Sequence, residues 1–367
     1  MRSGLVDRRS FVKAAGAAFL AGLAPSAAFA LSRADAVYAT GIRKPDRSFA
    51  LALMSEGGDF IAEIVLPDRI HGLAASPATG QVAAFARRPG TFILVFSPDG
   101  RGSRAIIHAA DDRHFYGHGT FSPDGRFLYA SENDFETRRG VIGIYDGRNG
   151  FVRIGEYPTY GIGPHDLAVS PDGRFLVAAN GGIETHPDFG RTKLNLDHME
   201  PLLALIDAAS GALVERHELP AGLSQLSTRH LAVGEAGRVW FACQYEGPRN
   251  ALPPLAGRFS PGEALSFAAL PEEVTIGLGN YVGAIAYNPR DGLIGLSSPK
   301  GAGMVVTLDE ASGKLLSSRT LADAAGIAPA LHGFAVGTYG GSFKGRHHDV
   351  AFDQHIQRLT GQPPEGR

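Results

Sequence analysis

The chain has 367 residues, of which 44% are hydrophobic and 20% are charged, and its formal net charge is −2. This balance is ordinary for a globular protein and offers no basic patch of the kind that phosphate backbones select, so we exclude nucleic acid as a partner. The single Cys243 excludes an internal disulfide and a site built from several thiolates. A bound metal ion would therefore need histidine, carboxylate or backbone oxygen ligands.

Residues 1–30 resemble a twin-arginine (Tat) export signal. Arg8 and Arg9 precede a short apolar stretch, which ends in the small-x-small sequence Ala28-Phe29-Ala30. We expect cleavage there, a periplasmic location, and one domain over residues 31–367. The apolar run is too short and too rich in Ala and Gly for a stable membrane anchor, and no other stretch is long enough, so we expect no membrane span in the mature protein. The resemblance also implies export in the folded state, which favours a bound metal or redox group.

After the signal, the chain alternates short apolar strands with turns. Three strand-like segments lie between Val37 and Pro67, and five units of four strands then begin at positions 71, 118, 165, 230 and 283, spaced by 47–65 residues. One unit reads HDLAVSPDG, RFLVAANGG, LLALID and ALVERHELP. Asp or Asn caps each turn and Gly adopts the left-handed conformation that the turn requires. A partial unit from Ala325 and the segment HHDVAFDQHI follow.

Repeated four-stranded units without long helical periodicity predict an all-β fold, a β-propeller. No unit can bury both faces alone, so neighbouring blades must supply the core. The leftover strands at the two ends of the chain are expected to pair and close the ring. This gives six or seven blades, and we favour seven because the leftover strands exceed what one blade can use.

A histidine stands at or near the start of four of these units, where the innermost strand of a propeller blade lines the central channel. The fifth unit has Gly283 instead, and His118 is displaced by one residue, which would turn it to the other face unless a β-bulge absorbs the shift. Alone, each histidine would be read as a structural residue that bonds a nearby turn. Together they favour a bound cation, with iron or copper as possible metals.

A long insertion, residues 181–201, interrupts the third unit, in what we take as its fourth-strand region, and is rich in His, Asp and Arg. Carboxylates at the second-strand ends of other units are expected at the same mouth of the channel. Arg87 and Arg88 lie at the equivalent place and would bind an anion or balance these carboxylates. The candidate metal ligands are thus His71, His118, His165, His230, His186, Asp188, Glu132 and Glu246.

The motifs HFYGHGTFSPDGRFLYASENDFETRRGVIGIYD, NGGIETHPDFGRTKLNLDHMEP, STRHLAV and NYVGAIA resemble a family of Tat-exported periplasmic propellers of unknown function, with a YVTN/lactonase-like repeat style. The resemblance covers nearly the whole mature chain. It implies a role in periplasmic iron acquisition or handling, with imelysin-type and di-haem oxidoreductase proteins as partners. It supplies no catalytic residues, and the chain has no C-x-x-C-H haem motif.

Three functions stay open at this point. The first is binding of a metal ion or small metal complex at the histidine-lined mouth of the channel. The second is a lactonase-like hydrolase, since lactonase propellers share this repeat style. The third is a non-catalytic scaffold for partner proteins. The sequence does not decide whether the site turns over a substrate.

Overall fold

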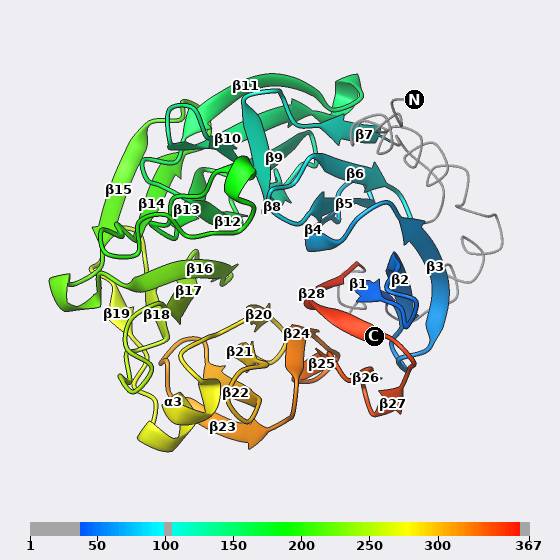
Figure 1. The fold of residues 1–367 in the computed structure, drawn as a ribbon, viewed down its shortest axis with the longest axis vertical. Helices are drawn as coiled ribbons and strands as arrows, with labels where there is room; N and C mark the ends of the chain where they lie inside the picture. The colour runs from blue at the N-terminus through cyan, green and yellow to red at the C-terminus, as the bar shows by residue number, and fades with distance from the viewer. Residues whose placement is uncertain (1–36, 99–104, 360–367) are drawn as a thin grey trace, which may run out of the picture.

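The computed structural model describes residues 37–98 and 105–359, and the expected signal, residues 1–30, lies outside this range. The described strands form seven four-stranded antiparallel sheets, arranged as blades around a central axis (Figure 1). The preference for seven blades is therefore confirmed. We number the blades in chain order and give their strands from the axis outward.

Blades 1 to 4 contain the following strands. Blade 1 comprises β28 (Ala351–Arg358), β1 (Val37–Arg43), β2 (Phe49–Ser55) and β3 (Phe60–Leu66); blade 2 comprises β4 (Ile70–Ser76), β5 (Gln81–Ala86), β6 (Phe92–Phe96) and β7 (Ala105–His108). Blade 3 comprises β8 (Arg113–Phe121), β9 (Phe127–Asp134), β10 (Arg139–Asp146) and β11 (Val152–Pro158); blade 4 comprises β12 (Pro164–Val169), β13 (Phe175–Asn180), β14 (Leu202–Asp207) and β15 (Leu213–Glu218).

Blades 5 to 7 complete the ring. Blade 5 comprises β16 (Leu226–Val233), β17 (Val239–Tyr245), β18 (Ala256–Phe259) and β19 (Ser266–Phe267); blade 6 comprises β20 (Ala284–Asn288), β21 (Leu293–Ser298), β22 (Met304–Asp309) and β23 (Leu315–Thr320). Blade 7 comprises β24 (Ala324–Pro329), β25 (Phe334–Thr338), β26 (Ser342–Phe343) and β27 (Arg346–His347). The α-helix α3 (Glu272–Leu278) lies at the rim beside β22 and β23 (Figure 1).

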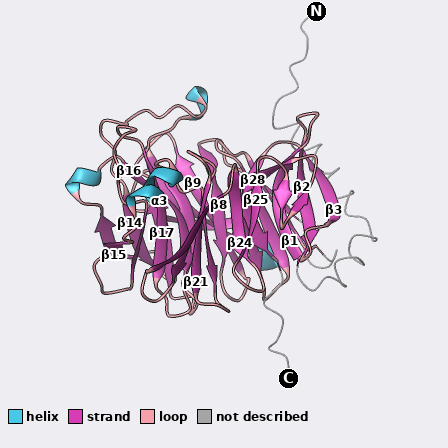
Figure 2. Cartoon of the chain, turned by 90° about the horizontal axis from the view of Figure 1, so that it is seen from below, coloured by secondary structure: helices cyan, strands magenta, loops and turns pink. Residues whose placement is uncertain are grey.

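The two ends of the chain close the ring, as expected. Strand β28 pairs with β1, with Tyr38 opposite Arg358 and Ile42 opposite Phe352. The last strand of the chain is therefore the innermost strand of the first blade. Figure 2 shows the disc from the side, with the strands crossing its thickness and the helical segments outside the sheets. No helix among the described residues is long and apolar enough to span a bilayer.

The repeated turn sequence forms the same hydrogen bonds in blades 3 and 4. Ser122 donates its hydroxyl proton to Asp124 and accepts a bond from the Phe127 backbone N–H, while Gly125 has φ +70°. Ser170 and Asp172 form the equivalent contact in blade 4. Each turn thus fixes the hairpin between the two innermost strands, and this sets the position of the strand that lines the channel.

Between the blades, large apolar side chains are fully buried. Phe85 of blade 2 and Phe115 of blade 3 belong to one buried cluster, and Trp240 lies in another cluster shared by blades 4 to 6. This inter-blade core confirms that neighbouring blades supply the burial that a single sheet lacks. The insertion at residues 181–201 lies between β13 and β14, the second and third strands of blade 4, so our assignment to the fourth-strand region was wrong.

Candidate functional site

Five histidines from five successive blades meet on the axis of the propeller. We call them the histidine cluster: His71, His118, His165, His230 and His355. The ring of His118 is central, because its centroid lies 4.7–5.3 Å from those of the other four. Blades 6 and 7 contribute no histidine, so the cluster is asymmetric.

Irregular pairing in the innermost strands places these side chains. In β4 the residues between Ile70 and Leu73 break the register with β5, and in β8 those between Phe115 and Gly119 break it with β9. Such bulges re-aim side chains that strict alternation would direct elsewhere. The displaced His118 is one of the bulged residues, and it points to the axis with the others.

The other three histidines of the cluster are also positioned by irregular strand pairing. The register shifts at His165 in β12, immediately before His230 in β16, and between Phe352 and Ile356 in β28. By contrast, β20 pairs with β21 in regular register and carries Gly283 before its first residue. A bulge in the inner strand is thus shared by all five blades that contribute a histidine, and it also occurs in β24 of blade 7, between Ala324 and Ile327.

Glycine at position 72 permits the close packing of the cluster. A Cβ added to Gly72 would lie 2.5 Å from the carbonyl oxygen of Gly117 and 2.9 Å from Nδ1 of His118. Both distances are below ordinary contact, so a side chain at position 72 would displace the backbone that carries His118.

Burial keeps the histidine cluster neutral. Desolvation lowers the pKa of His71, His118, His165 and His230 well below the usual value, and for each of them neighbouring cationic groups add to the shift. Burial lowers the pKa of His355 to about 4. Neutral imidazole is the form that binds metal ions, so near pH 7 the lone pairs of the cluster are available.

Four ring nitrogens of the cluster are buried without a hydrogen-bond partner among the described residues. They are Nδ1 of His71, Nε2 of His118, Nδ1 of His230 and Nε2 of His355. A buried polar atom without a partner is costly unless a ligand satisfies it. Candidate ligand atoms of His71, His118 and His355 lie within 4.8 Å of one another, as do those of His118, His165 and His230.

Asp166 orients the central histidine. Its carboxylate lies 3.4 Å from Nδ1 of His118, and it also accepts the backbone N–H groups of Leu167 and Leu231. Burial raises the pKa of Asp166 to about 7. A proton on Nδ1 of His118, held by this carboxylate, leaves Nε2 with its lone pair directed into the cluster. The arrangement matches the carboxylate–histidine pair that orients many metal ligands.

Arg229 fixes the protonation of His165. Its Nη1 lies 3.2 Å from Nδ1 of His165, and guanidinium can only donate, so Nδ1 is the acceptor. The proton of neutral His165 is therefore on Nε2, and this ring offers a donor rather than a free lone pair. The other terminal nitrogen of this guanidinium, Nη2, pairs with Glu246 at 3.4 Å.

The two sides of the cluster differ in character. On one side lies a channel cavity of about 340 Å³, lined by residues that follow the histidines on the inner strands, including Gly72, Thr120, Leu167 and Ile356. On the other side lie residues that precede the histidines, residues that end the second strands, and part of the insertion. Several of these are cationic, and we call Arg87, Arg88, Arg191 and Arg229 the arginine cluster.

The arginine cluster is buried to an unusual extent for cations. Arg88 is 8% exposed and Arg229 is 6% exposed, whereas Arg191 comes from the insertion and is exposed. Burial lowers the pKa of Arg87 and Arg88 to about 10, and repulsion from neighbouring arginines adds to the shift. The insertion covers this side, because its Lys193 pairs with Glu246 and its Thr185 contacts Tyr116.

The structure brings together four of the eight predicted ligands: His71, His118, His165 and His230. The other four do not belong to the histidine cluster. Glu246 lies nearby but pairs with Arg229 and Lys193. His186 and Asp188 form a local cap in the insertion, where the Asp188 N–H donates to Nδ1 of His186.

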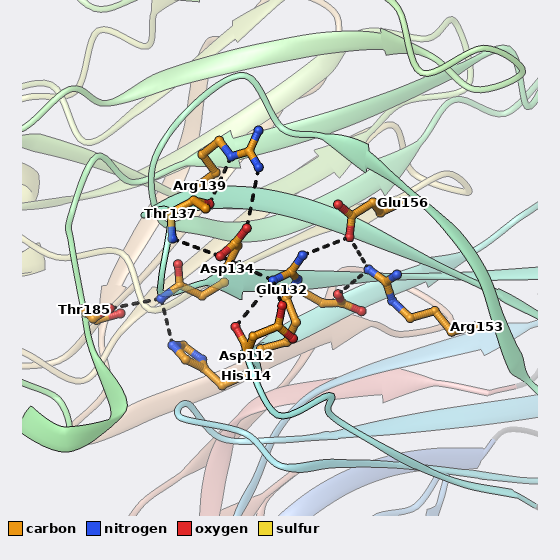
Figure 3. Close-up of polar contacts among 11 residues, drawn as sticks. Asp112, His114, Glu132, Asp134, Thr137, Arg139, Arg153, Glu156 and Thr185 are labelled. Atoms are coloured by element: carbon orange, nitrogen blue, oxygen red, sulfur yellow. Dashed lines mark hydrogen bonds and ion pairs between the residues drawn. The ribbon is translucent and has the colours of Figure 1, made fainter.

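Glu132 lies inside blade 3, where it accepts a bond from the Tyr145 hydroxyl. It also accepts a bond from Arg153 (Figure 3). Asn133 joins this blade to the insertion, since its side-chain amide bonds both His114 and the carbonyl of Thr185. Asn133, near the end of β9, thus holds the insertion in place.

Three residues of the site were not predicted: His355, Asp166 and Arg229. His355 lies within HHDVAFDQHI, which has no Ser-Pro-Asp-Gly turn to mark it as an inner strand. Asp166 and Arg229 stand directly beside predicted histidines. Their sequence signal was therefore a polar pair, His-Asp or Arg-His, at the head of an inner strand.

Comparison with solved structures supports the fold alone. The chain is similar to Kuenenia stuttgartiensis Hydrazine Synthase, with a TM-score of 0.60 and 16% identity over 85% of this chain and 94% of that one. It is also similar to the Cps50 (Swd1) β-propeller domain of Myceliophteria thermophila, with a TM-score of 0.54 and 12% identity over 82% and 93% of the two chains. A search of curated proteins finds no match. Residues 64–359 match the family described as "Protein of unknown function (DUF1513)", and the chain therefore belongs to this family.

Proposed function

We propose that the protein binds a transition-metal ion at the histidine cluster, through His71, His118, His230 and His355. The observation that carries this proposal is the set of four unpartnered ring nitrogens in one buried cluster. Loss of hydrogen bonding at these buried atoms is costly. Candidate ligand atoms of His71, His118 and His355 lie within 4.8 Å of one another, and the His230 ring lies 4.8 Å from that of His355 and 5.3 Å from that of His118, so an ion between these rings would supply the missing partners.

The charge state of the cluster supports a cation. Several imidazoles in contact would repel one another if protonated, and burial keeps them neutral. Neutral imidazole suits copper, zinc, nickel and iron. Asp166 supplies the carboxylate that fixes the tautomer of His118, the one ring in contact with all four others.

Metal binding would require the histidine rings to move slightly closer together. Nitrogen atoms around a tetrahedral ion stand about 3.4 Å apart when each bond is about 2.1 Å long. The candidate atoms of His71, His118 and His355 lie within 4.8 Å of one another, so the rings would close in by about 1 Å.

The biological setting of the proposal is periplasmic iron handling after Tat export. The twin-arginine sequence at Arg8 and Arg9 supports export, and the family resemblance supports the link to iron and to imelysin-type and di-haem oxidoreductase partners. The metal chemistry itself rests on the histidine cluster and does not depend on that setting.

Elemental analysis of the full chain, purified after export by its own signal, tests the proposal. We expect one transition-metal ion per chain, and its loss in the His71→Gln/His355→Gln double variant. The control is His347→Gln, because His347 is an exposed histidine on β27 at the rim. Protein that takes up no metal on reconstitution, or a double variant that keeps it, would contradict the proposal.

A further inference from the structure

The arginine cluster carries more positive charge than the ion pairs among the described residues neutralise. Arg69 forms two hydrogen bonds to Asp353, and Arg229 pairs with Glu246, which is shared with Lys193. Each of these carboxylates has a hydrogen-bonded or ion-paired partner of its own, and Asp353 also attracts Arg87 and Arg191 over a longer distance.

Among the described residues, Arg87, Arg88 and Arg191 have no ion pair and no side-chain hydrogen bond. For Arg88 this is unexpected, because its side chain is nine-tenths buried and lies beside Arg229. Burying a cation without a partner is costly, because the charge loses its hydration and gains no compensating interaction. Nε of Arg87 and Nε of Arg229 are also buried without a partner. The guanidinium groups are therefore arranged for an anion.

The space available favours a small anion. Of the arginine cluster, Arg87 lines a cavity of about 270 Å³ on this side of the propeller, together with Arg69, Tyr339 and Asp353. Sites for drug-sized ligands begin at about 300 Å³, so the occupant is smaller than such a ligand. Guanidinium groups bind carboxylate and phosphate oxygens in pairs, which matches several arginines around one compact, multiply charged anion.

The position of the cluster links the anion to the metal. Arg229 touches His165, so the arginine cluster begins where the histidine cluster ends. Four imidazoles supply no negative charge, and an oxygen of the anion would add a charged fifth ligand to the ion. An anion with several carboxylates can bind arginines with some of its oxygens and the metal with others.

We infer that the arginine cluster binds a small polycarboxylate that also ligates the metal, so that the protein takes up a metal–polycarboxylate complex. This inference rests on the proposed metal function and names the ligand class for the same site. Anion binding by the arginines can nevertheless be measured without any metal.

Calorimetry with citrate as the probe tests the inference, on chelator-treated protein and on metal-loaded protein freed of excess metal. We expect citrate to bind both forms, about tenfold or more tightly in the loaded form, and acetate and phosphate to bind at least tenfold more weakly. Arg88→Gln should weaken citrate binding by about tenfold or more, since it removes a charged hydrogen-bond donor. Arg191→Gln, on an exposed loop where folding is not at risk, should weaken it in the same direction.

Arg319→Gln is the matched control, since Arg319 is exposed on β23 at the rim, and it should bind citrate as the unaltered protein does. Absence of citrate binding, equal binding by phosphate, or unchanged binding in both Arg88→Gln and Arg191→Gln would overturn the inference. Citrate binding that is equal with and without metal would contradict the claim that the anion bound by the arginines also ligates the metal. Failure of the metal proposal would look different: no metal uptake, with citrate binding that still depends on Arg88.

Discussion

Nη1 of Arg229 lies 3.2 Å from Nδ1 of His165, so one buried guanidinium joins the arginine cluster to the histidine cluster. Because Arg229 donates this bond, His165 must keep its proton on Nε2. The five histidines are therefore not equivalent, although the chain presents them at similar places in successive blades. This difference separates His165 from the four rings with unpartnered nitrogens.

The first prediction follows from that difference. His71→Gln should lower metal affinity by about 100-fold or more, because four ligands together supply about 10–16 kcal/mol in structural zinc sites. His165→Gln should lower it less than about tenfold, since a glutamine oxygen can still accept the bond from Arg229. Competition against a chelator of known affinity measures both. Equal losses in the two variants would show that His165 is a ligand.

The second prediction concerns the carboxylate behind His118. Asp166→Asn should lower metal affinity by about 10–100-fold, the usual effect of removing the partner that orients a metal-bound histidine. The free energy of unfolding of the metal-free protein should not fall in parallel, because Asn removes a buried carboxylate whose charged form is disfavoured. Nitrogen NMR of His118 should show a changed tautomer. A normal tautomer with normal affinity would refute the role of Asp166.

The third prediction is a loss of stability in acid for the metal-free protein. Burial lowers the pKa of His114 and His355 to about 4, against about 6.5 in an unfolded chain, and it lowers that of the other cluster histidines too. The unfolded chain therefore binds protons first, and the free energy of unfolding should fall as the pH falls from about 6.5 to about 4. Asp166 opposes the trend, because its raised pKa lets the native state take up one proton below about pH 7.

Urea unfolding at pH 7.5, 5.5 and 4.5 measures the slope of the free energy of unfolding against pH. His114 lies in blade 3, outside the histidine cluster, so His114→Gln should reduce the slope by about one proton without affecting metal uptake. Stability that is flat or rises toward acid would contradict the burial of neutral histidines.

The fourth prediction separates Glu132 from the metal site. Tyr145→Phe removes the hydroxyl that donates to Glu132 and should lower the free energy of unfolding by about 1.5–3 kcal/mol, the usual value for a hydrogen bond to a charged group. Metal content should stay unchanged, because Glu132 and its ion-pair partner Arg153 lie inside blade 3 (Figure 3). Loss of metal in Tyr145→Phe would place Glu132 at the site after all.

The sequence was sufficient to predict the blades because the evidence for them is local. Ser-Pro-Asp-Gly and similar turns mark each inner hairpin, and Ser122 and Asp124 form the bonds that the turn requires. Four of the five cluster histidines were found because each precedes such a turn. His355 was missed because it sits in the closing strand β28, after the bulged residues Asp353 and Gln354 and without a following turn of that type.

The direction of side chains was harder to predict than the strands that carry them. Glu132 ends in an ion pair because Arg153, two strands away in blade 3, meets it across the sheet. The bulge that turns His118 to the axis likewise depends on how β8 pairs with β9. Such contacts join positions that are distant in the chain, so no local pattern reveals them.

Anomalous diffraction at the absorption edge of the metal, from crystals of the metal-loaded full chain, tests the central claim most directly. We predict one peak on the propeller axis, about 2.0–2.2 Å from the ring nitrogens of His71, His118, His230 and His355. A channel without a peak, or a peak only at His186 and Asp188 in the insertion, would contradict it.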